Sequence, residues 1–267
     1  METGIRTSSP KGHRPMLTEA LDVAIITAVF LGAWQLVFWM RFYPPYLFPS
    51  PAMTFATFLQ LITSGTLALG LFTTGYRLIG GFAIAVGAGI GIGLVMVTFR
   101  RFGRVMSSFA LGLQSFPSIA WVPFAILIIG LTDWGILFVM VMSSIFSVML
   151  STYAGIRNIP PIYLKASKNM GARRMSLFRR VMLPAAAPSL ITGIRQAWSF
   201  AWHALVGAEI LMATIGLGAI LYLGSEFARM DEIIAAMIVI FGIGFITDRL
   251  VFARLENGIR AKWGLSN

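Results

Sequence analysis

The sequence predicts an all-α fold, namely a polytopic membrane bundle of six transmembrane helices. The first reason is composition: hydrophobic residues make up 57% of the 267 residues and charged residues only 12%, whereas about a quarter of an ordinary globular domain is charged. The second reason is that apolar residues gather in runs of about 20, the length at which a helix crosses a bilayer core. The chain has no Cys, which excludes a disulfide scaffold, a thiolate metal site and a cysteine nucleophile.

Proline-rich and basic stretches separate these apolar runs and so define the six predicted spans. A loop rich in proline follows the first run, three arginines follow the second, and Pro117 and Pro123 interrupt the third, which we interpret as one broken span. The predicted spans cover residues 20–40, 78–99, about 112–131, 134–156, about 185–212 and about 232–252.

The distribution of positive charge predicts the orientation. Of the 21 Lys and Arg residues, seventeen fall into four segments: before the first span, at 100–104, at 157–180, and at 249–262 near the C-terminus. The positive-inside rule places these segments and both termini in the cytoplasm, which requires an even number of spans. We therefore expect a cytoplasmic N-terminal arm at 1–19 and a single transmembrane domain at 20–267.

Four glycines stand at alternate positions in the second predicted span: Gly87, Gly89, Gly91 and Gly93. Pairs four residues apart let two membrane helices approach closely. The pattern has two interpretations, packing against another helix of the same chain or contact with a second copy of the chain.

The residues needed for familiar catalytic sites are missing from the sequence. No lysine is followed by Ser or Thr, so there is no P-loop for ATP. His13 and His203 stand alone, which leaves no metal site of the His-x-x-Glu-His type, and there is no Gly-x-Ser-x-Gly elbow. We predict no catalytic residues and no metal ligands, so the chain must transport, bind, or depend on another subunit for energy.

The basic segment 157–184 predicts two short helices joined by a bend. Two prolines suit the first turn of a helix over 162–170, and Gly171 interrupts it. A second helix is predicted over 172–182, ended by Pro184 as the next span begins. An alternative is that the segment is only a positive loop that fixes the topology and lies against anionic lipid.

Within this segment the residues Lys165-Ala166-Ser167 are followed after three residues by Gly171 and after nine more by Val181-x-Leu183-Pro184. This spacing resembles the "EAA" loop of binding-protein-dependent ABC import permeases, which reads Glu-Ala-Ala, three residues, Gly, nine residues, Ile-x-Leu-Pro. Further motifs at 47–51, 115–123, 192–195, 205–209 and 216–218 are similar to the branch that imports nitrate, sulfonates, taurine and bicarbonate. The resemblance covers roughly residues 45–263.

The resemblance implies a fold like that of type I ABC importers and the role of permease subunit in a prokaryotic plasma (inner) membrane. It implies a homodimer or a paired permease, two cytoplasmic ATPase subunits that bind ATP and Mg²⁺, and an extracytoplasmic solute-binding protein that delivers a small anion or organosulfonate. The chain itself is then expected to hold no cofactor and to bind no nucleic acid.

The resemblance also implies that the segment at about 157–183 is a coupling helix that docks on the ATPase. Lys165 stands where the family has Glu, a reversal of charge, and Ser167 replaces the second Ala. Either the partner carries a compensating acid or the coupling contact is weaker. The residues expected to couple are Tyr163, Leu164, Lys165, Ala166, Ser167, Met170, Gly171, Ala172, Phe178, Leu183 and Pro184.

Polar residues inside the predicted spans are candidates for a substrate path, because ionisable groups in a bilayer usually face the bundle interior. A helix break at Pro117 could also expose backbone polar groups to a cavity. The alternatives are that Arg77 and Arg195 pair with carboxylates to hold helices together, and that Glu209 belongs to a closing gate. The candidates are Arg77, Gln114, Ser115, Ser118, Arg195, His203 and Glu209.

Three other functions remain open at this stage. A permease of the same kind for a thiamine or riboflavin precursor would have the same machinery and a different cargo. An ion-coupled secondary transporter would need paired inverted halves and acidic residues at mid-membrane, and neither is evident. A membrane-embedded enzyme is disfavoured because the catalytic constellations are missing.

Overall fold

The computed structural model describes residues 16–262, and within that range every regular element is helical, as predicted. Of the predicted arm at 1–19, residues 1–15 lie outside the described part of the chain, and the first helix already begins at Met16. The elements are α1 (Met16–Trp39), α2 (Pro51–Thr63), α3 (Thr66–Thr98), α4 (Arg100–Gln114), η1 (Ser118–Ala120), α5 (Trp121–Ile128), α6 (Asp133–Arg157), α7 (Pro161–Asn169), α8 (Arg174–Leu177), η2 (Phe178–Met182), α9 (Leu183–Leu211), α10 (Leu217–Glu226), α11 (Met230–Thr247), η3 (Asp248–Phe252) and α12 (Ala253–Lys262).

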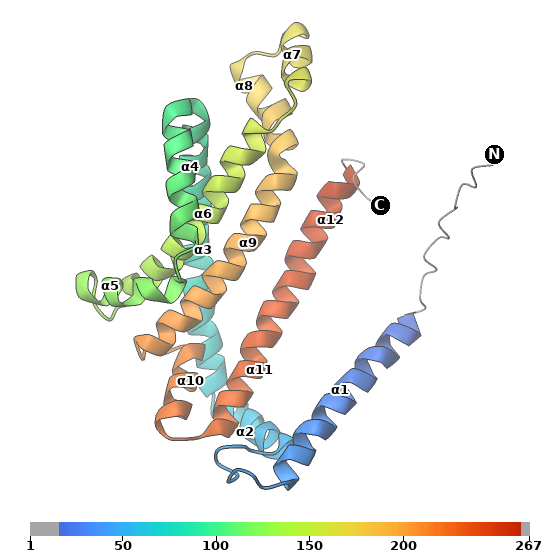
Figure 1. Ribbon diagram of the computed structural model, residues 1–267, viewed down its shortest axis with the longest axis vertical. Coiled ribbons are helices and arrows are strands. Elements are labelled where there is room, and N and C mark those ends of the chain that lie inside the picture. The colour runs from blue at the N-terminus through green and yellow to red at the C-terminus, as the bar shows by residue number, and fades with distance from the viewer. Residues whose placement is uncertain (1–15, 263–267) are drawn as a thin grey trace, which may run out of the picture.

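Helices α3, α6 and α9 form the centre of the bundle, with α6 packed against both of the others (Figure 1). The main core contains fully buried side chains from α6 and α9, among them Ile136, Met140 and Leu205. Helix α1 stands at the edge of the bundle, and the Trp34 indole N–H donates a hydrogen bond of 2.9 Å to the Pro49 carbonyl. The apolar surface of α1 is therefore left for lipid or for another protein.

By length and composition, four of the described helices can cross a membrane: Leu21–Trp39, Thr66–Thr98, Asp133–Arg157 and Met230–Gly258. The pair Arg100–Gln114 and Ser118–Ile128 counts as a fifth if the two form one broken span. The fifth predicted span, about 185–212, corresponds to α9, which at 29 residues is long enough but less apolar than those four helices. It packs along α6 and also contacts α3, α10 and α12, which agrees with this composition, since a helix surrounded by protein needs less apolar surface.

The second predicted span begins earlier than expected. Helix α3 starts at Thr66 rather than near residue 78, directly after Gly65, whose φ of +77° turns the chain. Arg77 therefore lies inside the helix and not at its margin. A charge can be accommodated there because other groups of the protein surround it, as described below.

The third predicted span is broken, with an angle of 93° between its two helices. The break lies at 115–117, where Pro117 cannot continue a helix. Pro123 does not break the chain, because it falls in the first turn of α5, where a backbone N–H has no partner within the helix. The arginines at 100–104 lie in α4 rather than in a loop, since the turn after α3 consists of Phe99 alone.

The glycines of α3 divide between the two predicted interpretations. A Cβ at Gly89 would lie 2.7 Å from the Val148 side chain of α6 and one at Gly93 would lie 2.6 Å from that of Thr152, so these two glycines allow the close packing of α3 on α6. At Gly87 and Gly91 nothing in the described part of the chain lies within 4 Å. Gly89 and Gly93 thus serve internal packing, as expected for the first interpretation, whereas Gly87 and Gly91 are exposed on the surface of α3.

Candidate functional site

The segment between α6 and α9, residues 158–182, forms a knuckle that projects at one end of the bundle (Figure 1). Helix α7 begins with Pro161 in its first turn and ends at Asn169, two residues before Gly171, whose φ is +83°. The Gly171 N–H donates to the Lys168 carbonyl and the Ala172 N–H to the Ser167 carbonyl, each at 3.0 Å. These two bonds are those of a Schellman turn, which requires the left-handed residue that glycine provides. The predicted bend is therefore confirmed.

The second helix of the knuckle differs from the prediction. It consists of the short α8 and the π-helical turn η2, and it continues into α9 without an end at Pro184. Pro184 lies in the first turn of α9, and the preceding N–H, that of Leu183, donates back to the Phe178 carbonyl. Pro184 has no N–H to donate, and the helix continues through it because the preceding turn is closed by the Leu183 N–H in the wider π pattern.

The knuckle has one face on the bundle and one face in the open. Leu164 and Met182 are half-buried and pack against Ile156 and Ile159, which form a small core below the knuckle. On the other face, large apolar side chains stand exposed: Ile162 is 66% exposed, Tyr163 56% and Met170 87%. Exposed apolar residues in such a group are typical of a protein or membrane contact.

The residues predicted to couple all lie in this knuckle or at its junction with α9. Lys165, Ala166 and Gly171 are exposed, whereas Ser167, Ala172 and Phe178 are half-buried. The Ser167 hydroxyl donates to the Tyr163 carbonyl at 2.7 Å and is thus used within α7.

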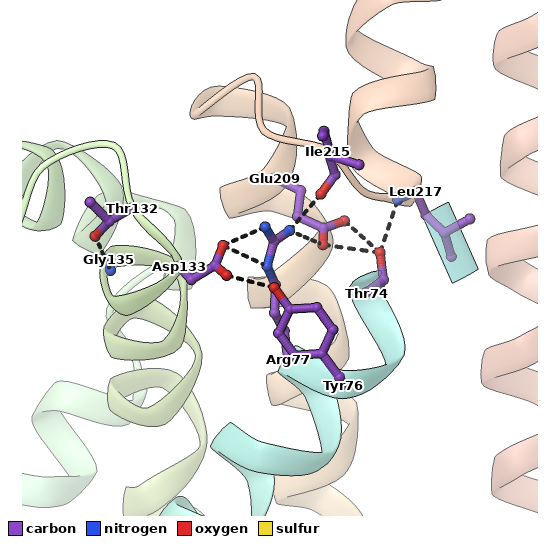
Figure 2. A network of polar contacts seen from close by, with 9 residues as sticks. All are labelled: Thr74, Tyr76, Arg77, Thr132, Asp133, Gly135, Glu209, Ile215 and Leu217. Atoms are coloured by element: carbon purple, nitrogen blue, oxygen red, sulfur yellow. Dashed lines mark hydrogen bonds and ion pairs between the residues drawn. The ribbon is translucent and has the colours of Figure 1, made fainter. Parts of the chain in front are cut away.

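At the opposite end of α3, a network of polar contacts surrounds Arg77 (Figure 2). The guanidinium donates to Asp133 Oδ1 at 2.5 and 3.1 Å, to Glu209 Oε1 at 3.0 Å and to the Ile215 carbonyl at 2.6 Å. The Arg77 side chain is 4% exposed and that of Glu209 is 0% exposed. A charged pair in such a place persists only when its partners satisfy it, and here they do.

Glu209 also fixes the connection between α9 and α10. Its carboxylate accepts from the Thr74 hydroxyl at 2.9 and 3.0 Å and from the Gly218 N–H at 3.0 Å. The Leu217 N–H donates to the Thr74 hydroxyl oxygen at 2.9 Å, as Figure 2 shows. A Cβ at Gly216 would overlap the Glu209 carboxyl group, so the chain can pass this close only with glycine. We call Thr74, Arg77, Asp133 and Glu209 the polar network.

The residues predicted as a substrate path lie in separate places. Arg77 and Glu209 belong to the polar network, Gln114, Ser115 and Ser118 surround the bend between α4 and α5, and His203 is exposed on α9. Arg195 pairs with Asp248 and with Glu256, each at 2.7 Å, and its side chain is 37% exposed. The alternative interpretation, in which Arg77 and Arg195 hold helices together, is confirmed for both.

Sequence reasoning missed Thr74 and Asp133. Asp133 directly follows Thr132, whose hydroxyl caps α6 by accepting from the Gly135 N–H at 3.3 Å. An acid at the start of a span, opposite an arginine inside another, was the available signal. Among the described residues no three His, Asp or Glu side chains gather as a cation site would require.

Comparisons with known proteins agree with this architecture. Residues 83–260 match the family described as binding-protein-dependent transport system inner membrane component. An ABC transporter permease of Methanocaldococcus jannaschii is 30% identical over 72% of each chain. The aliphatic sulfonates transport permease SsuC of Bacillus subtilis is 27% identical over 90% of this chain and 86% of its own. The nitrate import permease NrtB of Synechocystis is 25% identical over 91% of this chain and 88% of its own.

Among solved structures, the MetNI methionine ABC transporter in an inward facing conformation is similar in fold. The TM-score is 0.63 with 17% sequence identity, over 74% of this chain and 97% of that chain. At this identity the similarity concerns the fold alone.

Proposed function

The chain belongs to the family of binding-protein-dependent transport system inner membrane components, and we propose that it carries a small oxyanion or organic sulfonate through the membrane as the permease of an ABC importer. The cargo class comes from relatives named for sulfonates and nitrate, which this chain matches over about nine tenths of its length. The sequence of this chain lacks a P-loop, so the ATP that drives transport is proposed to be hydrolysed by a partner subunit.

The observation that carries the proposal is the knuckle. Its outer face presents Ile162, Tyr163 and Met170 to the surroundings at one end of the bundle, while its inner face is attached to α6 and α9. We propose that this face docks on a cytoplasmic ATPase subunit, which binds ATP and Mg²⁺. An apolar anchor surrounded by basic residues suits a groove with an acidic rim.

The proposed mechanism follows from mechanical coupling. When two ATPase subunits close on ATP, the docked knuckles of two permeases move together, and α9 transmits the movement because η2, the last turn of the knuckle, continues into α9 without a loop. The bundle then passes from an inward-open to an outward-open state, and hydrolysis reverses the change. Only differential docking of the partner to the two states can shift this equilibrium.

Lys165 has a definite place in this proposal. It is exposed on α7, where the family motif has an acidic residue. We propose that the partner offers an acidic side chain at this position, so that the ion pair is retained with its signs exchanged.

Transport by the reassembled importer tests the proposal. The complete complex, with its ATPase and its solute-binding protein, is placed in vesicles and offered labelled ethanesulfonate, nitrate, bicarbonate and a thiamine precursor. We expect ATP-dependent uptake of one of the three anions. Uptake of the thiamine precursor alone would replace the proposed cargo, and uptake driven by an ion gradient without ATP would contradict the importer itself.

A further inference from the structure

A cavity of about 600 Å³ lies beneath the knuckle, between the end of α3, the start of α4 and the end of α6. Three arginines line it: Arg100 and Arg104 from α4, and Arg157 from the last turn of α6. The rest of the lining is apolar or aromatic, and no Asp or Glu is part of it. The cavity therefore combines strong positive charge with an apolar wall.

The three arginines are exposed and have no ion pair with any carboxylate of the described residues, as is also true of Arg101 and Arg179, but these three line one cavity. Arg77, Arg195 and Arg229 each pair with at least one acid within 3.0 Å. Three like charges around one cavity repel each other, and nothing on the described chain compensates them. An anion from outside the chain would remove this repulsion.

Contacts hold the side chain of Arg157 in place, and helix α4 fixes the positions of Arg100 and Arg104. Arg157 donates a hydrogen bond to the hydroxyl of the buried Tyr153, and its guanidinium lies 5.5 Å from the centre of that ring. Arg100 and Arg104 are four residues apart and so share one face of α4. Gly103 between them lets α4 approach α3, because a Cβ there would overlap the Met96 carbonyl.

The arginines also stand at a defined depth. Arg100 follows an uncharged stretch over 78–99, and Arg157 follows an uncharged stretch over 134–156. Each stretch is long enough to cross the hydrocarbon core, so both arginines reach the level of the lipid headgroups. Apolar side chains such as Met96 and Ile156 border the cavity at this level.

We propose that this cavity binds the phosphate headgroup of an anionic phospholipid. The arginines suit a phosphate oxyanion, and the apolar wall suits the glycerol and the upper acyl chains. The inference goes beyond the transport function and depends only on the proposed orientation, in which this end of the bundle faces the cytoplasm.

The bound lipid would connect the knuckle to the bundle. Leu164 of α7 and Met182 of η2 belong to the wall of the cavity, opposite the arginines of α4 and α6. A lipid in the cavity therefore contacts both the part that moves and the part that spans the membrane. Occupancy is expected to stiffen the knuckle against α3 and α6.

Lipid retention by the full-length chain tests the inference. The protein is purified in a neutral detergent and offered equal amounts of phosphatidylglycerol and phosphatidylcholine, and bound lipid is measured by native mass spectrometry. We expect phosphatidylglycerol to be retained in preference. One arginine near an anionic surface contributes about fivefold to affinity, so the triple variant Arg100→Gln, Arg104→Gln, Arg157→Gln should lose at least about tenfold.

Two matched variants separate a site from general attraction. Arg101→Gln, Arg179→Gln, Arg180→Gln removes the same charge from exposed residues outside the cavity lining and should retain the lipid. Replacing the three lining arginines with Lys keeps the charge and should restore most of the binding, which shows that the Gln variant did not simply misfold.

Several outcomes would overturn the inference. Equal loss in the two Gln variants, or equal retention of the two lipids, would mean that the cavity is no lipid site. Binding of inorganic phosphate or ethanesulfonate that depends on the lining arginines and matches phosphatidylglycerol would make it a site for free anions. Loss of the lipid when the ATPase subunits are bound would assign the cavity to acidic side chains of that partner. Each readout is independent of transport, so a wrong cargo would not affect it.

Discussion

The two ends of the bundle use their charges in opposite ways. In the polar network, the Arg77 guanidinium meets two carboxylates and a backbone carbonyl, and its side chain is almost completely buried. In the knuckle, Lys165, Lys168 and Arg179 are exposed and have no ion pair with a described residue. The first arrangement holds the chain together, whereas the second is available to a partner.

A charge in or near a span therefore does not reveal its role by its presence alone. Arg77 and Arg195 were plausible contacts for an anionic cargo, but their hydrogen-bonding capacity is taken up by acids of the same chain. A group whose partners are already inside the protein would have to lose them before it could bind cargo. Unpaired groups, such as those around the knuckle, are better candidates for contacts with other molecules.

A substitution in the knuckle is predicted to abolish transport. Gly171→Pro should abolish ATP-dependent uptake, because proline cannot adopt the φ of +83° and also removes the N–H that bonds to Lys168. The bundle should keep its stability, since Gly171 is exposed and nothing described lies within 4 Å of its Cβ position. Uptake into vesicles and the thermal unfolding temperature of the same preparation would measure both.

A matched variant sharpens this test. Gly171→Asn keeps the N–H, and asparagine tolerates the left-handed conformation better than most residues, so uptake should largely remain. Normal uptake by the proline variant would show that the bend does not transmit the movement, and the coupling role would have to be assigned elsewhere.

The second prediction concerns the polar network. Arg77→Met leaves the Glu209 carboxylate buried without its cation and should lower the free energy of unfolding by about 3–5 kcal/mol. The fold, rather than cargo affinity, should suffer, because Arg77 joins α3 to α6 and to α9. Denaturant unfolding in detergent would measure the loss.

A double variant and a glycine variant test the same network without leaving a fully buried charge unpaired. Arg77→Met combined with Glu209→Gln should be less destabilised than Arg77→Met alone, because the carboxylate that remains, Asp133, is 47% exposed and no fully buried one is left unpaired. Gly216→Ala keeps every charge and should still destabilise, since its Cβ would displace the Glu209 carboxyl group. Unchanged unfolding with weaker uptake in Arg77→Met would return Arg77 to the substrate path.

Local rules were sufficient to predict the bend of the knuckle. The proline at 161 and the glycine at 171 fix the ends of α7 through their own backbone geometry, so neighbouring residues contain all the information. The same rules were wrong at Pro184, because a π turn brought the chain into α9 where an end of the helix was expected. Similarly, the charge of Arg77 led to a predicted span that begins at residue 78, whereas α3 begins at Thr66 and the partners of Arg77 allow its charge inside the helix.

The polar network could not be predicted from local pattern. Arg77 and Glu209 are separated by 132 residues, and Thr74 and Leu217 by 143. Their contact depends on how α3, α9 and α10 pack, which is decided by many side chains across the whole core. Sequence alone identified the charged residues and left open whether each one held the fold or faced a ligand.

The weakest effect on stability is predicted for Arg195, which is paired like Arg77 but partly exposed like the knuckle residues. It is paired with Asp248 and Glu256, yet its side chain is 37% exposed and that of Asp248 43%. Exposed ion pairs contribute about 1 kcal/mol or less, so Arg195→Gln should lower the free energy of unfolding by no more than about 1 kcal/mol. The same denaturant unfolding, compared directly with Arg77→Met, would measure it. A loss as large as that of Arg77→Met would show that a neighbouring chain or lipid shields this pair in the membrane, because only a shielded pair reaches that strength.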